Sequence, residues 1–132
     1  MAKILVVDDE EHIVMILKDS LEFSGFQVVT AADGLEALQV FEKEQPELVV
    51  LDIGMPKLDG WEVCRRLKSD PKTRDVPIII LTAYAQTSDQ RRGLQLGADR
   101  FVTKPCDLTY LVEEMNMLLS LRKKPSSPES GR

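Results

Sequence analysis

Short, continuous apolar runs alternate with segments of helical periodicity along most of the chain. Five such runs lie near residues 3–8, 26–31, 47–52, 76–82 and 99–103. Apolar runs of this length, separated by helices, are typical of strands that are buried on both faces of a parallel sheet. The pattern therefore predicts an α/β protein in which a helix follows each of five strands.

The segments between these runs repeat their apolar residues every three or four positions, which indicates amphipathic helices. We expect the helices near residues 11–24, from 33, 59–69, 87–96 and from 107. The first has Ile13, Leu17, Leu21 and Ser24 on one stripe, and the fifth has Leu108, Leu111, Val112, Met115, Leu118 and Leu119. Capping boxes are expected at Asp33 with Glu36 and at Asp59 with Glu62, and glycine stops at Gly25 and Gly97.

Polar residues of complementary chemistry follow four of the predicted strands. Asp8 and Asp9 follow the first, Asp52 ends the third, Thr82 ends the fourth, and Lys104 follows the fifth. If the strands are parallel, these groups meet at the carboxyl edge of the sheet, where open α/β folds place their sites. Each residue alone fits a solvated turn, a cap or a strand position. Their convergence is what favours a functional site, because clustered carboxylates repel one another unless a cation joins them.

Composition limits the classes of function. The chain has 132 residues, of which 43% are hydrophobic and 30% charged, and its formal net charge is -5. These values fit one domain with an acidic surface and argue against direct nucleic-acid binding. No apolar run approaches a membrane span and no signal peptide is evident, so we expect neither a membrane partner nor secretion. Two cysteines and one histidine make a zinc site improbable and favour the cytoplasm.

A set of ordered motifs resembles the receiver domain of bacterial two-component response regulators. The motifs are Asp8-Asp9, Leu51-Asp52-Ile53-Gly54-Met55-Pro56, Asp59-Gly60, Thr82-Ala83, Gly97-Ala98-Asp99 and Lys104-Pro105. The resemblance covers about residues 2–122. It implies a doubly wound, five-stranded parallel sheet in the flavodoxin-like order 2-1-3-4-5, with helices on both faces. We accordingly expect a receiver domain over 1–122 and a flexible tail, or the start of a linker, over 123–132.

The resemblance also implies roles for the polar residues. Asp52 matches the phosphoacceptor, a carboxylate nucleophile that forms an acyl phosphate. Asp9, Asp52 and the carbonyl of Gly54 would bind Mg²⁺, and Asp8 would act mostly through water. Lys104 would pair with Asp52 and then with the phosphoryl group, and the Thr82 hydroxyl would move toward that group.

Further positions carry structural or tuning roles in the family. The bond before Pro105 is expected to be cis, and Cys106, where an aromatic residue is common, is taken as packing filler. Gly54 and Tyr84 match variable positions that affect how readily water attacks the acyl phosphate. Phe101 matches the aromatic switch residue, whose ring would change rotamer as Thr82 moves.

Partner surfaces follow from the same resemblance. A sensor histidine kinase or histidine phosphotransfer protein would dock on Glu10, Ile13, Ile16 and Pro105. The readout surface would combine the fourth helix, fifth strand and fifth helix, carrying Arg91, Arg92 and Arg100 against Glu113 and Glu114. Arg100 stands where many receivers have an acid, so we expect a monomer that docks a downstream protein or an attached output domain, rather than a phosphorylation-dependent dimer.

The predicted function is a phosphorylation-activated signalling switch, not an enzyme acting on a separate substrate. No helix-turn-helix or catalytic output domain is visible, so the chain is either a stand-alone regulator or the receiver of a longer transcription factor or output enzyme. A haloacid-dehalogenase-type phosphatase also forms an aspartyl phosphate, but such enzymes have an Asp where Gly54 stands here. A flavodoxin-like flavin binder needs a Ser, Thr and Gly-rich loop, whereas the acids at 8–11 would repel a phosphate.

Overall fold

A single five-stranded parallel sheet organises the computed structural model, which describes residues 1–55, 57–83 and 86–123. Its strands, in spatial order, are β2, β1, β3, β4 and β5, which is the order implied by the resemblance to receiver domains. They span Lys3–Val7 (β1), Gln27–Ala31 (β2), Leu48–Leu51 (β3), Ile78–Thr82 (β4) and Arg100–Thr103 (β5). Tyr84, Pro56 and residues 124–132 lie outside the described residues, so the expectations for Tyr84 and the tail remain predictions.

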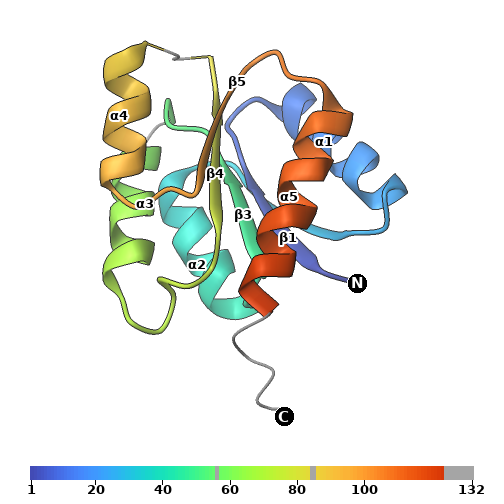
Figure 1. Cartoon of the computed structure of the whole chain (residues 1–132), viewed down its shortest axis with the longest axis horizontal. Helices are drawn as coiled ribbons and strands as arrows, with labels where there is room; N and C mark the ends of the chain where they lie inside the picture. Colours follow the sequence, from blue (N-terminus) through green and yellow to red (C-terminus); the bar gives the residue numbers. More distant parts are fainter. Residues whose placement is uncertain (56, 84–85, 124–132) are drawn as a thin grey trace.

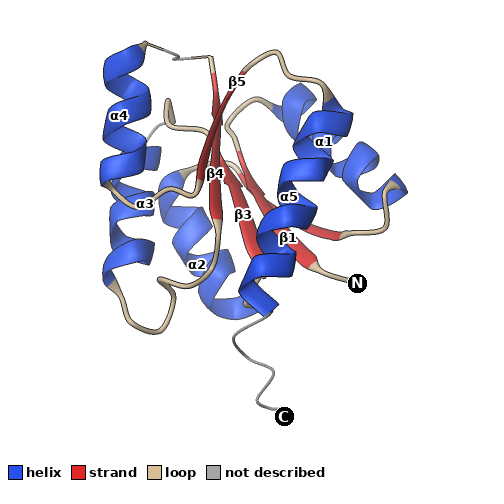
Figure 2. Ribbon diagram, in the orientation of Figure 1, coloured by secondary structure: helices blue, strands red, loops and turns tan. Residues whose placement is uncertain are grey.

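Within the described residues, five helices cover the sheet on both faces (Figures 1 and 2). They are α1 (Glu11–Phe23), α2 (Gly34–Glu44), α3 (Gly60–Ser69), α4 (Thr87–Gln95) and α5 (Leu108–Lys123). Helices α1 and α5 pack on one face, and α2, α3 and α4 lie on the other.

Alternating side chains of the strands divide the core into two layers. In β1, Ile4 and Val6 contact the layer that contains α1 and α5, whereas Leu5 and Val7 contact the other. Strands β3 and β4 alternate in the same way, and nearly all of these residues are fully buried. Burial on both faces explains why the strands appear in the sequence as unbroken apolar runs rather than alternating ones.

The helix ends agree with most of the predicted signals. Gly25 and Gly97 have positive φ of 99° and 100°, a conformation that favours glycine, and each follows a helix end. Asp33 accepts a hydrogen bond from the Glu36 backbone N–H, and the Glu36 carboxylate accepts one from Ala32. The capping box of α2 is therefore present, but the Glu36 carboxylate accepts from Ala32, the residue before the N-cap, and not from Asp33 itself.

Two local predictions were wrong. The Glu62 carboxylate does not bond back to the start of α3; it pairs with Arg65 and Arg66 instead, because both arginines lie within one turn on the same face. Only the Asp59 half of that box is formed, at 3.0 Å from the Glu62 N–H. Ser24 is not part of the buried stripe of α1, because it follows the last helical residue and is exposed. The buried residues of this helix are Leu17 and Leu21.

Candidate functional site

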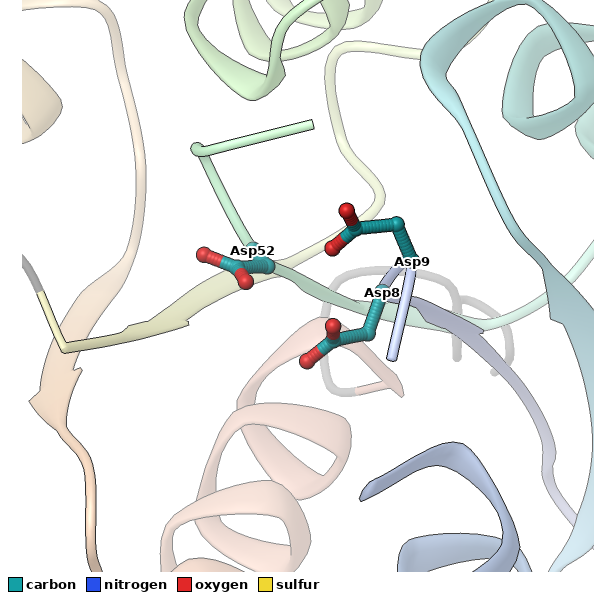
Figure 3. Close-up of side chains that lie close together, drawn as sticks. All are labelled: Asp8, Asp9 and Asp52. Carbon is teal, nitrogen blue, oxygen red and sulfur yellow. The ribbon is translucent and has the colours of Figure 1, made fainter. Parts of the chain in front are cut away.

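Three carboxylates meet at the carboxyl edge of the sheet, where β1 and β3 lie side by side (Figure 3). Asp8, Asp9 and Asp52 each place an oxygen within 4.8 Å of the others. Asp8 and Asp52 are buried, with 3% and 8% of their surfaces exposed, whereas Asp9 is open to solvent. The register is set by the sheet itself, since the Asp52 N–H donates to the carbonyl of Val7 at 3.0 Å.

The Asp52 side chain is oriented by its own loop. Its Oδ1 accepts hydrogen bonds from the backbone N–H groups of Ile53, at 2.7 Å, and of Gly54, at 3.3 Å. The other oxygen, Oδ2, faces the Lys104 ammonium at 3.3 Å. One carboxylate oxygen is thus fixed by the backbone, and the other lies beside a cation at the rim of the site.

Lys104 reaches both buried acids from the end of β5. Its Nζ lies 2.6 Å from Asp8 Oδ2, closer than its 3.3 Å distance to Asp52 Oδ2. The contact with Asp52 was expected from the resemblance to receiver domains, whereas the shorter contact with Asp8 was not predicted. The peptide bond from Lys104 to Pro105 is cis.

Burial and charge work against each other in this cluster. Burial raises the pKa of Asp8, although the hydrogen bond from Lys104 and the Glu10 backbone N–H both act to lower it. Burial also acts to lower the pKa of Lys104, but its hydrogen bond to Asp8 and the charges of Asp52 and Asp8 outweigh that effect, so the pKa is raised. Lys104 therefore stays a cation at neutral pH.

Two glycines allow neighbouring segments to close around the Asp52 loop. A Cβ on Gly60, the first residue of α3, would lie 2.3 Å from the Asp52 carbonyl oxygen, so α3 begins directly against the backbone of that residue. A Cβ on Gly34 would lie 1.9 Å from the carbonyl oxygen of Leu58. The close approach at Gly34 was not predicted, although a glycine directly after a helix cap, at the start of an amphipathic helix, is a usable signal.

The predicted switch residues lie between the site and α4. Thr82 is fully buried at the end of β4, and its carbonyl accepts a hydrogen bond of 2.8 Å from the Lys104 N–H. Phe101 is half-buried on β5 and packs against the core layer under α4. A Cβ on Gly93 of α4 would lie 3.1 Å from the Phe101 ring, which means that ring and helix are already in close contact.

The predicted docking residues gather on one side of the site. Ile13, Ile16 and Pro105 line an apolar hollow of about 480 Å³ that extends to Lys104. Ile16 is 55% exposed, and Glu10 precedes α1 without capping it through its side chain. Cys106 lines the same hollow and is half-buried, and burial raises the pKa of its thiol.

Two arginines of the predicted α4, β5 and α5 readout surface have partners within the chain. The Arg92 guanidinium lies over the Trp61 ring of α3, at 4.6 Å from the ring centroid. Arg100 pairs with Glu114, at 2.7 Å. Both arginines therefore have partners in the chain itself, and fewer free charges face outward than the sequence suggested.

The donor set fits a hard divalent cation. Carboxylate oxygens and a backbone carbonyl are the protein ligands that Mg²⁺ prefers, and it commonly keeps several waters beside one or two carboxylates. Asp9 is accessible from solvent, whereas Asp8 and Asp52 are buried. Both oxygens of Asp8 already accept hydrogen bonds, from Glu10 N–H and Lys104, and so do both oxygens of Asp52, from its own loop and Lys104. A doubly wound sheet with acids, a hydroxyl and a lysine at its carboxyl edge defines a receiver-type α/β protein.

Comparison with known proteins gives the same class. The family model described as "Response regulator receiver domain" matches residues 4–116, and the chain belongs to that family. The receiver domain of a signal transduction histidine kinase from Syntrophus aciditrophicus superposes with a TM-score of 0.87 and 37% identity, and the match covers 94% of each chain.

Two curated relatives extend beyond the matched region. The chain is 55% identical to the "Probable transcriptional regulator ycf27" of Pyropia yezoensis, over 98% of this chain and 54% of that protein. It is 53% identical to the alkaline phosphatase synthesis transcriptional regulatory protein PhoP of Bacillus subtilis, over 78% of this chain and 42% of that protein. The chain thus spans about half the length of the curated relatives it matches. None of the helices in the described part of the chain has the length and apolar content needed to cross a bilayer.

Proposed function

We propose that this receiver is switched by transfer of a phosphoryl group to Asp52. The observation that carries the proposal is the orientation of that side chain, with Oδ1 held by two backbone N–H groups and Oδ2 beside Lys104. A carboxylate held in this way is positioned to act as a nucleophile, and phosphoryl transfer depends mainly on positioning and charge neutralisation.

In the proposed reaction, an Asp52 oxygen attacks the phosphorus of a phosphohistidine or a small acyl phosphate. A new P–O bond forms as the bond to the donor atom breaks, and the donor keeps that electron pair. Lys104 neutralises charge on the phosphoryl oxygens, and the Thr82 hydroxyl donates a hydrogen bond to one of them. Asp9, Asp52 and the Gly54 carbonyl would hold Mg²⁺, with Asp8 acting through water; the cation supplies further neutralisation of the phosphoryl charge.

Mass spectrometry with a small acyl phosphate and Mg²⁺ tests this proposal. The wild-type chain should gain one phosphoryl group, and Asp52→Asn should gain none, because an amide is not a competent nucleophile. Asp75→Asn, on an exposed loop, is the matched control and should label like wild type. Full labelling of Asp52→Asn would disprove the assignment of the phosphoacceptor.

We further propose a cytoplasmic monomer that takes its phosphoryl group from a histidine kinase or phosphotransfer protein docked at Glu10, Ile13, Ile16 and Pro105. The apolar hollow formed by three of these residues beside Lys104 supports that docking position. Output would pass to a downstream protein or to an attached output domain, consistent with relatives about twice as long. Light scattering with and without beryllofluoride, a mimic of the phosphoryl group, tests the monomer; a shift to twice the mass would contradict it.

A further inference from the structure

A second groove lies between α1 and α5, away from the carboxylate cluster. It has a volume of about 590 Å³. The half-buried Leu108 and Val112 of α5 line it together with Phe23 at the end of α1. Phe23 is 94% exposed, so its ring contributes little to the core. Single exposed apolar residues are common, but this one borders a hollow that is itself partly apolar.

The charge at this groove has one sign. Its remaining lining residues are Asp19, Ser20, Ser24, Thr109 and Glu113. The lining thus carries two exposed carboxylates and no lysine or arginine. A partner that fits must place apolar side chains beside Phe23 and cationic side chains near the rim, because an anionic surface would be repelled.

We propose that this groove docks a basic amphipathic helix of another protein. A large apolar side chain of that helix packs against Phe23 and Val112. Its lysine or arginine side chains lie beside Asp19 and Glu113. Recognition of this type uses a preformed hydrophobic groove for affinity and the charged rim for orientation.

A second copy of the chain fits the groove less well. Two copies related by a twofold axis would present the same surface to each other, which brings Asp19 and Glu113 of both copies to one interface. None of the lining residues is cationic, so nothing in the groove offsets that repulsion. The groove shares only Leu108 with the hollow beside Lys104, so a helix docked here leaves Asp52 accessible.

The test uses a synthetic amphipathic peptide of about three helical turns, with leucine on one face and lysine on the other. Its matched control carries glutamate in place of every lysine. Titration into the chain of 132 residues, followed by amide chemical shifts, should show saturable binding of the lysine peptide only, with shifts concentrated at residues 19–25 and 108–113. Phe23→Ser should weaken binding at least about tenfold, as loss of an aromatic anchor does.

Matched variants test whether peptide binding depends on the groove itself or only on the net negative charge of the chain. Met15→Ser removes another exposed apolar residue of α1, outside the groove, and should leave the affinity unchanged. Replacing both Asp19 and Glu113 by lysine should transfer the preference to the glutamate peptide. Labelling of Asp52 by a small acyl phosphate should be the same in Phe23→Ser as in wild type, so the result does not depend on the proposed phosphorylation.

Several outcomes would overturn the proposal. Equal binding of both peptides, an unchanged affinity in Phe23→Ser, or shifts centred on Asp8 and Asp52 would each do so. A concentration-dependent dimer that Phe23→Ser abolishes would assign the groove to a second copy instead. Peptide binding seen only after removal of residues 124–132 would assign it to the chain's own C-terminal segment.

Discussion

The ammonium of Lys104 lies 2.6 Å from Asp8 and is therefore the counter-ion of the most buried carboxylate in the site. Burial of that carboxylate raises its pKa, and the contact with Lys104 opposes the rise. A charge-assisted hydrogen bond of this length is among the stronger polar contacts in proteins. Lys104 therefore organises the acid cluster as a whole and does not serve Asp52 alone.

Replacing Lys104 by alanine should strengthen Mg²⁺ binding and slow phosphoryl uptake. Removal of a cation that competes for the same carboxylates makes a second cation more favourable there, by at least about threefold in affinity after allowance for solvent screening. Calorimetric titration with Mg²⁺ measures the effect. Lys57→Ala is the control, since that ammonium faces Asp33 at the surface, and Asp9→Ala should weaken binding. An unchanged or lower affinity in Lys104→Ala would contradict this account.

Gly34→Ala should destabilise the fold more than Gly25→Ala. The added Cβ would lie 1.9 Å from the Leu58 carbonyl oxygen. A Cβ on Gly25 meets nothing within 4 Å, so Gly25→Ala loses stability only because alanine is strained at the positive φ of that position. We expect about 3 kcal/mol for Gly34, from forced displacement of the loop, and about 1 kcal/mol for Gly25. Denaturant unfolding measures both. Because the displaced loop carries Gly54, Gly34→Ala should also weaken Mg²⁺ binding. Equal losses of stability in Gly34→Ala and Gly25→Ala would show that the close approach of Gly34 to Leu58 does not hold this loop in place.

The stabilisation from Glu62 should disappear in acid. Hydrogen bonds from Arg65 and then Arg66 lower the pKa of this carboxyl from 4.5 to about 2. A lowered pKa in the folded state stabilises the fold above the unfolded value and loses that effect as the pH falls toward 2. Glu62→Gln should therefore lower the melting temperature at pH 7. The difference in melting temperature between the variant and wild type should shrink to zero as the pH falls from about 4.5 to about 2. Glu42→Gln, exposed on α2, is the control; a difference that persists at pH 2 would exclude the charge as its cause.

A phosphoryl mimic should move α4 only through Thr82. Addition of beryllofluoride should shift the amide resonances of Gly54, Phe101 and Gly93 in wild type, because the Phe101 ring and Gly93 are in close contact. A ligand can bias such packing only by contacting one arrangement better than the other. In Thr82→Ala the Gly54 shift should remain while those of Phe101 and Gly93 are lost, and Thr103→Ala, exposed on β5, should behave as wild type. Unchanged Phe101 and Gly93 resonances in the wild-type complex would remove the coupling.

The positions of the strands and of the acids were accessible from the pattern of the sequence, whereas the strand order was implied by the resemblance to receiver domains. Strands buried on both faces need apolar residues at every position, so they appear as short, continuous runs. The polar residues that follow four of the five runs mark the carboxyl edge of the sheet. Local signals were equally informative where the interaction is local: Asp33 and Glu36 bond within one helical turn, and the glycines at 25 and 97 satisfy backbone geometry near their own positions.

Contacts between distant segments were decided only by the tertiary structure. Lys104 and Asp8 are separated by 96 positions. Whether the ammonium lies nearer to Asp8 or to Asp52 depends on how β5 pairs with β4 and on how the sheet places β4 relative to β3 and β1. The same holds for Gly34 beneath the Leu58 carbonyl and for Arg92 over Trp61. Hydrophobic periodicity specifies which face of a helix is buried, but not which side chain of a neighbouring element it meets. That choice is made by close packing, in which shifts of an ångström exchange one partner for another.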